Sequence, residues 1–248
     1  MKIKIKTGLK YITAMGLFAG IMSSAIAEVQ SAYNYRVFRD AIDDARWQRG
    51  DNSETRCSGS DCRSTMDSSS NQDYIWTDSS TRILHFSTDG NEDDGWRNEL
   101  RFVDSFSRGS TRTMTATVGY WAGRSTSSGL TIAQLHMESD DDYDNEGPVA
   151  RLEIVDEDTF KVVWREGYSC TSNCVERDEY STSTSGFKDI QLRTSGNVLN
   201  VSVQGQTFSY DMDGGDANWP SDGAYYWKAG VYLQREGSAF VGFENLTW

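Results

Sequence analysis

Apolar and polar side chains alternate over short segments of the chain from residue 113 onward. In residues 113–120, Met114, Ala116, Val118 and Tyr120 alternate mainly with threonines. Successive side chains of a strand point to opposite faces, so this period of two predicts a strand with one buried face. Further strand-like runs occupy residues 151–155, 160–165, 188–194, 198–203, 207–212 and 239–248.

Turn-forming residues separate these runs. The acidic segment 156–159 and the segment 195–197 each join two runs, and residues 204–206 lead into the run at 207–212. Strand-like runs joined in this way are typical of β-hairpins. Short strands with such connections, and without alternating helices, predict an all-β fold: a sandwich or jelly roll of two antiparallel sheets.

The first part of the chain gives weaker signals. Residues 35–47 contain alanines among interspersed charges and are the one segment that we expect to be helical. Residues 51–72 are polar and rich in serine, which predicts a long surface loop beside the binding site. No repeat or linker divides residues 28–248, so we expect them to form one domain.

Residues 1–27 have the pattern of a secretory signal peptide. Four lysines precede an apolar run from about residue 11 to 22, and Ala25 and Ala27 supply small residues at a cleavage site. The apolar run is short for a membrane anchor, and no stop-transfer pattern follows it. We therefore expect cleavage after Ala27 and a secreted or periplasmic protein.

The charge balance limits the possible partners. Residues 1–27 hold four of the 24 basic residues and none of the 37 acidic ones, so residues 28–248 have a net charge of 20 − 37 = −17. Such a chain is poorly suited to nucleic acids or anionic membranes. An anionic substrate would need a local cationic patch, for which Arg97, Arg101 and Lys228 are the candidates.

Four cysteines form two close pairs in the sequence, Cys57 with Cys62 and Cys170 with Cys174. Four cysteines allow three disulfide pairings, and the sequence does not choose among them. Export favours disulfides. A zinc site is disfavoured because no Cys-x-x-Cys spacing occurs and the chain has only two histidines.

The acidic segment 140–147 has oxygen ligands at alternate positions, as a calcium loop would. It lacks the full twelve-residue pattern with a closing glutamate, so we expect a solvated loop and no metal. Of the two histidines, His85 stands alone in a strand-like context, and we expect it to be structural.

The candidate chemistry lies in three segments: RNELR at 97–101, QLH at 134–136 and YWKAGVYLQ at 226–234. In each, the polar side chains occupy alternate positions and therefore share a strand face. These sets are Arg97, Glu99 and Arg101; Gln134 and His136; and Tyr226, Lys228, Tyr232 and Gln234. The intervening residues, such as Leu100, Leu135 and Trp227, suit a core. The polar face indicates binding of an anion and proton chemistry on it.

Each segment alone has an ordinary explanation, such as a cross-strand ion-pair ladder or a strand with a glycine bulge. In combination and in this order, the three segments resemble the alginate lyases of polysaccharide lyase family 7. That family carries Arg-x-Glu-Leu-Arg, Gln-(Ile/Val)-His and Tyr-Phe-Lys-Ala-Gly-x-Tyr-x-Gln motifs. The resemblance implies a jelly roll whose concave sheet forms the substrate groove.

The resemblance also implies the reaction and the residues that perform it. The family cleaves anionic polysaccharides of uronate units by β-elimination, without a metal or cofactor. Arg97 and Gln134 would neutralise the uronate carboxylate, His136 would act as base, and Tyr232 as acid or as both. Substrate-binding roles fall to Glu99, Arg101, Lys228 and Gln234, with Glu99 orienting the arginines. We expect an endo-acting monomer.

Departures from the family motifs leave the substrate open. Leu135 replaces the usual Ile or Val, Trp227 replaces Phe, and Leu233 stands where Asn is common. A lyase for another uronan, such as ulvan or glucuronan, could keep the same catalytic set. Two further alternatives are a non-catalytic carbohydrate-binding jelly roll and a glycoside hydrolase. The hydrolase would need two acidic residues on one groove, and Glu99 is the only acid in the three motifs.

Overall fold

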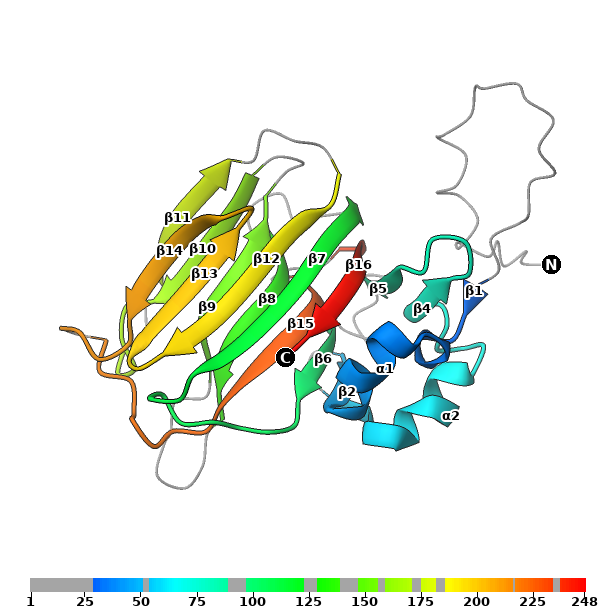
Figure 1. The fold of residues 1–248 in the computed structure, drawn as a ribbon, viewed down its shortest axis with the longest axis horizontal. Helices are drawn as coiled ribbons and strands as arrows, with labels where there is room; N and C mark the ends of the chain where they lie inside the picture. The colour runs from blue at the N-terminus through cyan, green and yellow to red at the C-terminus, as the bar shows by residue number, and fades with distance from the viewer. Residues whose placement is uncertain are drawn as a thin grey trace.

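The computed structural model describes residues 29–50, 54–88, 97–122, 129–138, 147–155, 159–170, 175–181, 186–215, 217–233 and 237–248. Within these residues, two antiparallel sheets of eight strands each pack face to face (Figure 1). This arrangement confirms the predicted all-β jelly roll. No helix in the described ranges has the length and apolar character needed to cross a membrane.

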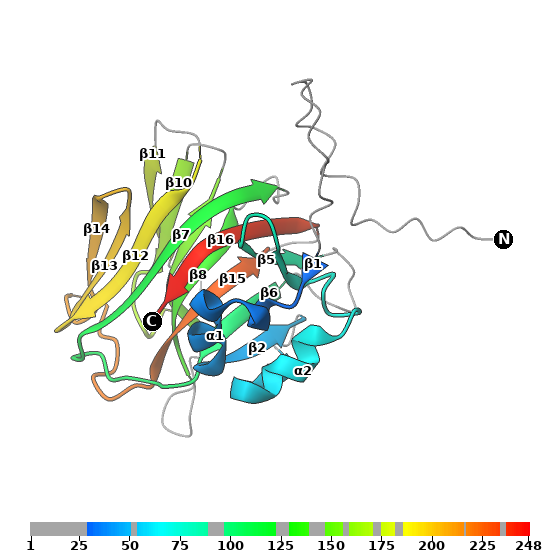
Figure 2. The same ribbon diagram turned by 45° about the vertical axis from the view of Figure 1, so that its right-hand side comes forward.

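The first sheet contains, in spatial order, β1 (Val29–Gln30), β4 (Ile75–Asp78), β5 (Leu84–Thr88), β16 (Ala239–Thr247), β7 (Arg112–Ala122), β12 (Lys188–Ser195), β13 (Val198–Val203) and β14 (Gln206–Asp211). The second contains β11 (Val175–Ser181), β10 (Thr159–Arg165), β9 (Gly147–Ile154), β8 (Leu130–Met137), β15 (Tyr225–Tyr232), β6 (Arg97–Phe102), β2 (Ala45–Arg49) and β3 (Glu54–Ser58). The helices are η3 (Ala32–Asn34), α1 (Arg36–Asp43), η4 (Gly59–Asp61) and α2 (Cys62–Asp67). Both views show α1 and α2 close to β2, at one end of the sandwich (Figures 1 and 2).

Alternating apolar residues form the core between the sheets. On β7, Met114, Ala116 and Val118 are buried, and on β15 Trp227, Ala229 and Val231 are buried from the facing sheet. The predicted strands at 113–120, 151–155, 160–165, 188–194, 198–203, 207–212 and 239–248 are all present as β7, β9, β10, β12, β13, β14 and β16. Their neighbours pair as the predicted hairpins, with β9 against β10 and β12 against β13.

The predicted helix at 35–47 is wrong in its second half. Helix α1 ends at Asp43, and β2 begins at Ala45. The strand forms because these residues pair with β6, and Trp47 lies opposite Leu100. The Trp47 indole is fully buried, and its Nε1 donates a hydrogen bond of 2.6 Å to Asn98 Oδ1. Tertiary pairing thus overrides the local helix signal.

The predicted long loop at 51–72 is also wrong. Its described part contains β3, η4 and α2. A disulfide joins Cys57 on β3 to Cys62 at the start of α2, with 4.9 Å between their Cα atoms. This selects one of the open cysteine pairings. Cys170 is disulfide-bonded as well, and Cys174 lies outside the described residues.

His85 on β5 lies in the first sheet, away from the three motifs. Its imidazole stacks on Trp76 with ring centroids 4.9 Å apart. Burial lowers the pKa of His85 to about 4, although Asp78 acts in the opposite direction. The unfolded chain therefore takes up a proton near pH 6.5, well before the folded chain does.

We expect His85 to make the fold sensitive to acid. Because its folded pKa is lowered, its contribution to stability is present above pH 6.5 and is lost as the pH falls toward 4. At about 1.4 kcal/mol per pH unit, the loss amounts to about 3 kcal/mol. Urea unfolding between pH 7 and 4 measures it. His85→Phe keeps a ring on Trp76 but does not titrate, so the free energy of unfolding of this variant should fall less between pH 7 and 4. An equal fall in the variant and the native protein would show that His85 is not the cause.

Candidate active site

The three motifs lie on adjacent strands in the middle of the second sheet. Strand β15 is paired with β8 on one side and β6 on the other (Figure 2). Lys228 stands opposite Arg101 on β6 and opposite Gln134 on β8. Tyr226 stands opposite His136. Directly opposed residues in an antiparallel sheet share a face, so the structure brings the predicted polar side chains together.

Glu99 lies at the centre of this group and is fully buried. Its Oε2 is 3.2 Å from Arg97 Nε and 3.8 Å from Lys228 Nζ. Gln134 donates a hydrogen bond from Nε2 to the other oxygen, Oε1. One carboxylate therefore accepts a hydrogen bond from Gln134 and forms ion pairs with Arg97 and Lys228, so it contacts side chains of three strands. In this position it can orient Arg97 and Gln134 without being exposed itself.

His136 is held in a defined orientation. Its Nδ1 is 3.0 Å from the Met137 carbonyl oxygen and 2.9 Å from the Tyr226 hydroxyl. A carbonyl only accepts, so in the neutral ring Nδ1 carries the proton and Nε2 has the free lone pair. The His136 and Tyr226 rings also stack, with centroids 5.2 Å apart.

The surroundings of His136 favour its neutral form. Burial, followed by the positive charge of Lys228, lowers its pKa well below 6.5. Arg97 and Arg101 act in the same direction, and the hydrogen bond to Met137 opposes them. At neutral pH, His136 is therefore an uncharged imidazole with an available Nε2, which is the form that a base requires.

Two arginines lie over the two tyrosines of this face. The Arg97 guanidinium carbon is 4.3 Å from the centre of the Tyr232 ring, and that of Arg101 is 3.9 Å from the Tyr226 ring. Arg101 also forms an ion pair of 2.8 Å with Glu138. Tyr226 is buried, whereas Tyr232 is partly exposed. Tyr232 can thus meet a ligand from solvent while Arg97 fixes its ring.

A bulge at Gly230 sets the direction of Tyr232. Ala229 pairs with Ala133, and the next paired residues are Tyr232 and Thr131. Two residues of β15 therefore lie between these pairs where β8 has one, so the extra residue belongs to β15. Gly230 has φ of 148°, a conformation that side chains disfavour. A Cβ at this position would collide with the Asn98 carbonyl oxygen and lie 2.7 Å from Glu99 Cα. Only glycine therefore fits at position 230 of this strand.

We expect Gly230→Ala to destabilise the protein by about 3 kcal/mol, from backbone strain and the collision with β6. It should also lower activity, because β6 carries Arg97 and Glu99. Urea unfolding and initial rates measure the two effects. Gly196→Ala is the matched control: Gly196 also has positive φ, 60°, but a Cβ there would meet nothing within 4 Å. Equal losses in both variants would refute the role of the collision.

The structure adds contacts and residues to the site that the sequence did not indicate. Tyr226 was placed on the polar face, but its contact with His136 depends on pairing between β15 and β8. Arg151 and Glu153 on β9 extend the same face, with Arg151 opposite Gln134. Nothing in the sequence around residue 151 indicates this register.

Two further predictions concern parts of the chain that are not described. Gln234, a predicted substrate-binding residue, lies outside the described residues. So does the acidic segment 140–146. Within the described ranges, no group of three or more His, Cys, Asp or Glu side chains is placed to hold a metal ion.

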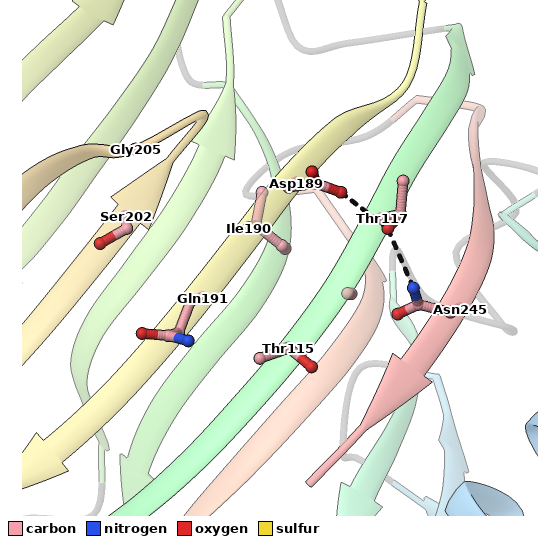
Figure 3. Close-up of a pocket in the computed structure, with 9 residues that line it drawn as sticks. Thr115, Thr117, Asp189, Ile190, Gln191, Ser202, Gly205 and Asn245 are labelled. Carbon is pink, nitrogen blue, oxygen red and sulfur yellow. Dashed lines mark hydrogen bonds between the residues drawn. The ribbon is translucent and has the colours of Figure 1, made fainter.

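A hollow of about 380 Å³ lies on the other sheet (Figure 3). Among its lining residues, Thr117 Oγ1 donates a hydrogen bond to Asp189 at 2.9 Å and accepts one from Asn245 Nδ2 at 3.0 Å. The hollow contains none of the motif residues. It is lined by Thr115, Ala116, Thr117, Asp189, Ile190, Gln191, Ser202, Gly205 and Asn245. The candidate active site is therefore the polar face of the second sheet.

Comparison with known families identifies the family of this chain. The sequence profile described as "Alginate lyase" matches residues 46–247. The chain belongs to the alginate lyase family. It is a polysaccharide lyase of family 7, as the three motifs predicted. A search of curated protein sequences found no match.

Solved structures of alginate lyases share the fold. Alginate lyase A1-II' is 20% identical, with a TM-score of 0.68 over 88% of this chain and 97% of that one. AlyC3 in complex with dimannuronate is 15% identical, with a TM-score of 0.67 over 88% and 94%. Alginate lyase PA1167 from Pseudomonas aeruginosa is 18% identical, with a TM-score of 0.60 over 83% and 97%. At these identities, the similarity establishes the fold of this lyase and not its substrate.

Proposed function

We propose that this lyase cleaves alginate by β-elimination and releases oligosaccharides with a 4,5-unsaturated end. The observation that carries the proposal is the presence of Arg97, Gln134, His136 and Tyr232 on one face of three adjacent strands. Glu99 links the first two through its buried carboxylate. A sugar-binding module without catalysis would have no need for an oriented neutral histidine and a partly exposed tyrosine on the same face.

Neutralisation of the substrate carboxylate is the first requirement of the reaction. The C5 proton of a uronate is barely acidic, because its removal puts a second negative charge next to the carboxylate. Arg97 and Gln134 can donate hydrogen bonds to that carboxylate and stabilise the developing charge. Arginine suits the task because its planar guanidinium matches a carboxylate. Their fixation by Glu99 means that the donors are in place before substrate binds.

Proton transfer is the second requirement. The C5–H bond breaks, its electron pair forms the C4–C5 double bond, and the glycosidic oxygen leaves C4 with a proton. His136 can accept the C5 proton at Nε2, and Tyr232 can donate its hydroxyl proton to the leaving oxygen. Where the C5 proton and the leaving oxygen lie on the same side, Tyr232 serves for both. Such acid–base assistance contributes about 10²- to 10⁴-fold in rate.

Ultraviolet absorbance tests the proposal directly. Purified protein would be incubated separately with polyguluronate, polymannuronate, ulvan and glucuronan. Elimination creates a conjugated double bond that absorbs in the ultraviolet, whereas hydrolysis does not. We expect absorbance to rise on polyguluronate, polymannuronate or both. A rise only on ulvan or glucuronan would replace alginate with that substrate, and new reducing ends without absorbance would show hydrolysis instead.

We further propose that the enzyme is exported, loses residues 1–27, acts within the polymer chain and works as a monomer. The lysines and the apolar run of residues 1–22 support export. N-terminal sequencing of protein from the culture medium or periplasm should begin at Glu28.

Endo action should lower the viscosity of the polymer early in the reaction, before small products accumulate. For a monomer, light scattering should give the mass of one chain.

A further inference from the structure

A row of cationic and amide side chains crosses five strands of the second sheet. Arg46 on β2 pairs with Arg101 on β6, and Arg101 pairs with Lys228 on β15. Lys228 pairs with Gln134 on β8, and Gln134 pairs with Arg151 on β9. The next position, on β10, is the buried Val163. Arg151 is therefore separated by an apolar position from Arg177 on β11, which pairs with Val163, and it lies next to a predicted catalytic residue.

The surroundings of Arg151 repeat those of Arg97. Arg97 Nε is 3.2 Å from a carboxylate oxygen of Glu99, and Arg151 Nε is 3.2 Å from one of Glu153. Both arginine side chains are 15% exposed, while Glu99 is fully buried and Glu153 is 3% exposed. In each pair, a buried carboxylate two residues along the strand forms an ion pair on the Nε side of a guanidinium that remains partly accessible.

An ion pair of this kind would contribute little to the stability of the fold. Burial of Glu153 requires desolvation, which an ion pair with a partly exposed arginine offsets only in part. The same arrangement on β6 forms part of the active site. A guanidinium with a carboxylate on its Nε side still offers its Nη atoms, which can bind a second carboxylate through two parallel hydrogen bonds.

We propose that Arg151 binds a carboxylate of the polymer, on the sugar unit next to the one that is cleaved, and that Glu153 positions it. This inference rests on the proposed function and adds a substrate contact to it. Gln134 faces the cleaved unit and Arg151 lies one strand further, about 4.8 Å away in a sheet. A uronate polymer has one carboxylate per sugar, so a chain lying along the cationic row would present its next carboxylate to Arg151.

Binding and kinetics of Arg151→Gln test the proposal. Oligomannuronate and oligoguluronate binding would be measured by calorimetry in the Tyr232→Phe background, where turnover does not interfere. We expect the dissociation constant of the preferred oligomer to rise about tenfold, as for loss of one hydrogen bond between charged groups. In the otherwise native enzyme, KM for the polymer should rise by a similar factor with little change in kcat. The affinity should also depend less on salt.

Two further variants separate binding from folding. Arg193→Gln removes the same charge from an exposed position on β12 of the other sheet and should behave as the native protein. Arg151→Gln with Glu153→Gln leaves no buried carboxylate without its cation, so it should recover stability but not affinity. If Arg151→Gln binds and turns over like Arg193→Gln, or if the double variant recovers affinity, Arg151 does not contact substrate.

The outcomes for the two proposals differ. Absence of unsaturated product from the native enzyme on all four polymers would overturn the proposed reaction. Weaker oligomer binding by Arg151→Gln would still support the contact in that case. Product formation by the native enzyme, with unchanged affinity in Arg151→Gln, would overturn the inference and leave the lyase reaction in place.

Discussion

Tyr232→Phe is expected to lower kcat by about 10²- to 10⁴-fold. The change removes only the hydroxyl that we propose as the proton donor to the leaving oxygen. It keeps the ring beneath Arg97, whose guanidinium carbon lies 4.3 Å from the ring centre. The bulge at Gly230 and the pairing of residue 232 with Thr131 do not involve the hydroxyl. Binding of substrate should therefore change far less than turnover.

Initial rates from ultraviolet absorbance, together with calorimetry on oligosaccharides, measure the two effects separately. Tyr35→Phe is a suitable control, since it removes a hydroxyl that bonds Gln30 at 3.3 Å, outside the second sheet. It should leave both quantities unchanged. A Tyr232→Phe enzyme with native kcat would exclude Tyr232 as the acid and turn attention to other groups near the leaving oxygen.

Glu99→Gln is expected to reduce both stability and activity. Glu99 is fully buried and is approached by Arg97, Gln134 and Lys228. The neutral amide of the new glutamine leaves Arg97 and Lys228 without a counter-charge. Its N–H groups would also face the N–H groups of these cations. Breaking a buried pair in this way costs about 3 to 5 kcal/mol. Displacement of Arg97 and Gln134 should lower kcat/KM by about 10²-fold, as for loss of one preorganised donor.

Urea unfolding and kcat/KM would be measured alongside Glu244→Gln, which makes the same chemical change at an exposed position of β16. The control should match the native protein in both. A Glu99→Gln enzyme that is destabilised but retains native kcat/KM would show that Glu99 supports the fold without orienting the donors. A Glu99→Gln enzyme as stable as the Glu244→Gln control would show that the buried ion pairs of Glu99 do not stabilise the fold.

Much of the sheet architecture could be predicted from sequence because it depends on a local pattern. Period-two alternation at 113–120 and in the motif at 226–234 places each side chain on its face, whatever the partner strand is. Predictions of this kind were confirmed for β7, β12, β13 and β15. The shared face of Arg97, Glu99 and Arg101 was predicted for the same reason.

Features that depend on contacts between distant segments could not be predicted. Strand β2 was missed because Ala45 and Trp47 have a weak local preference, and pairing with β6 decides their conformation. The link from Glu99 to Lys228 requires the register of β6 against β15. Arg151 enters the same row only through the pairing of β8 with β9. Each of these is a matter of strand order and register, which spacing within one motif does not contain.

The pairing of β2 with β6 bears on how far the chain could be shortened. The three motifs begin at residue 97, so residues 29–58 look dispensable for chemistry. Without β2 and β3, however, β6 would become the outermost strand of its sheet, with a row of unsatisfied N–H and C=O groups. Such an edge is a template for pairing with another molecule. A lyase trimmed to its motif-bearing part should therefore self-associate through the strand that carries Arg97 and Glu99.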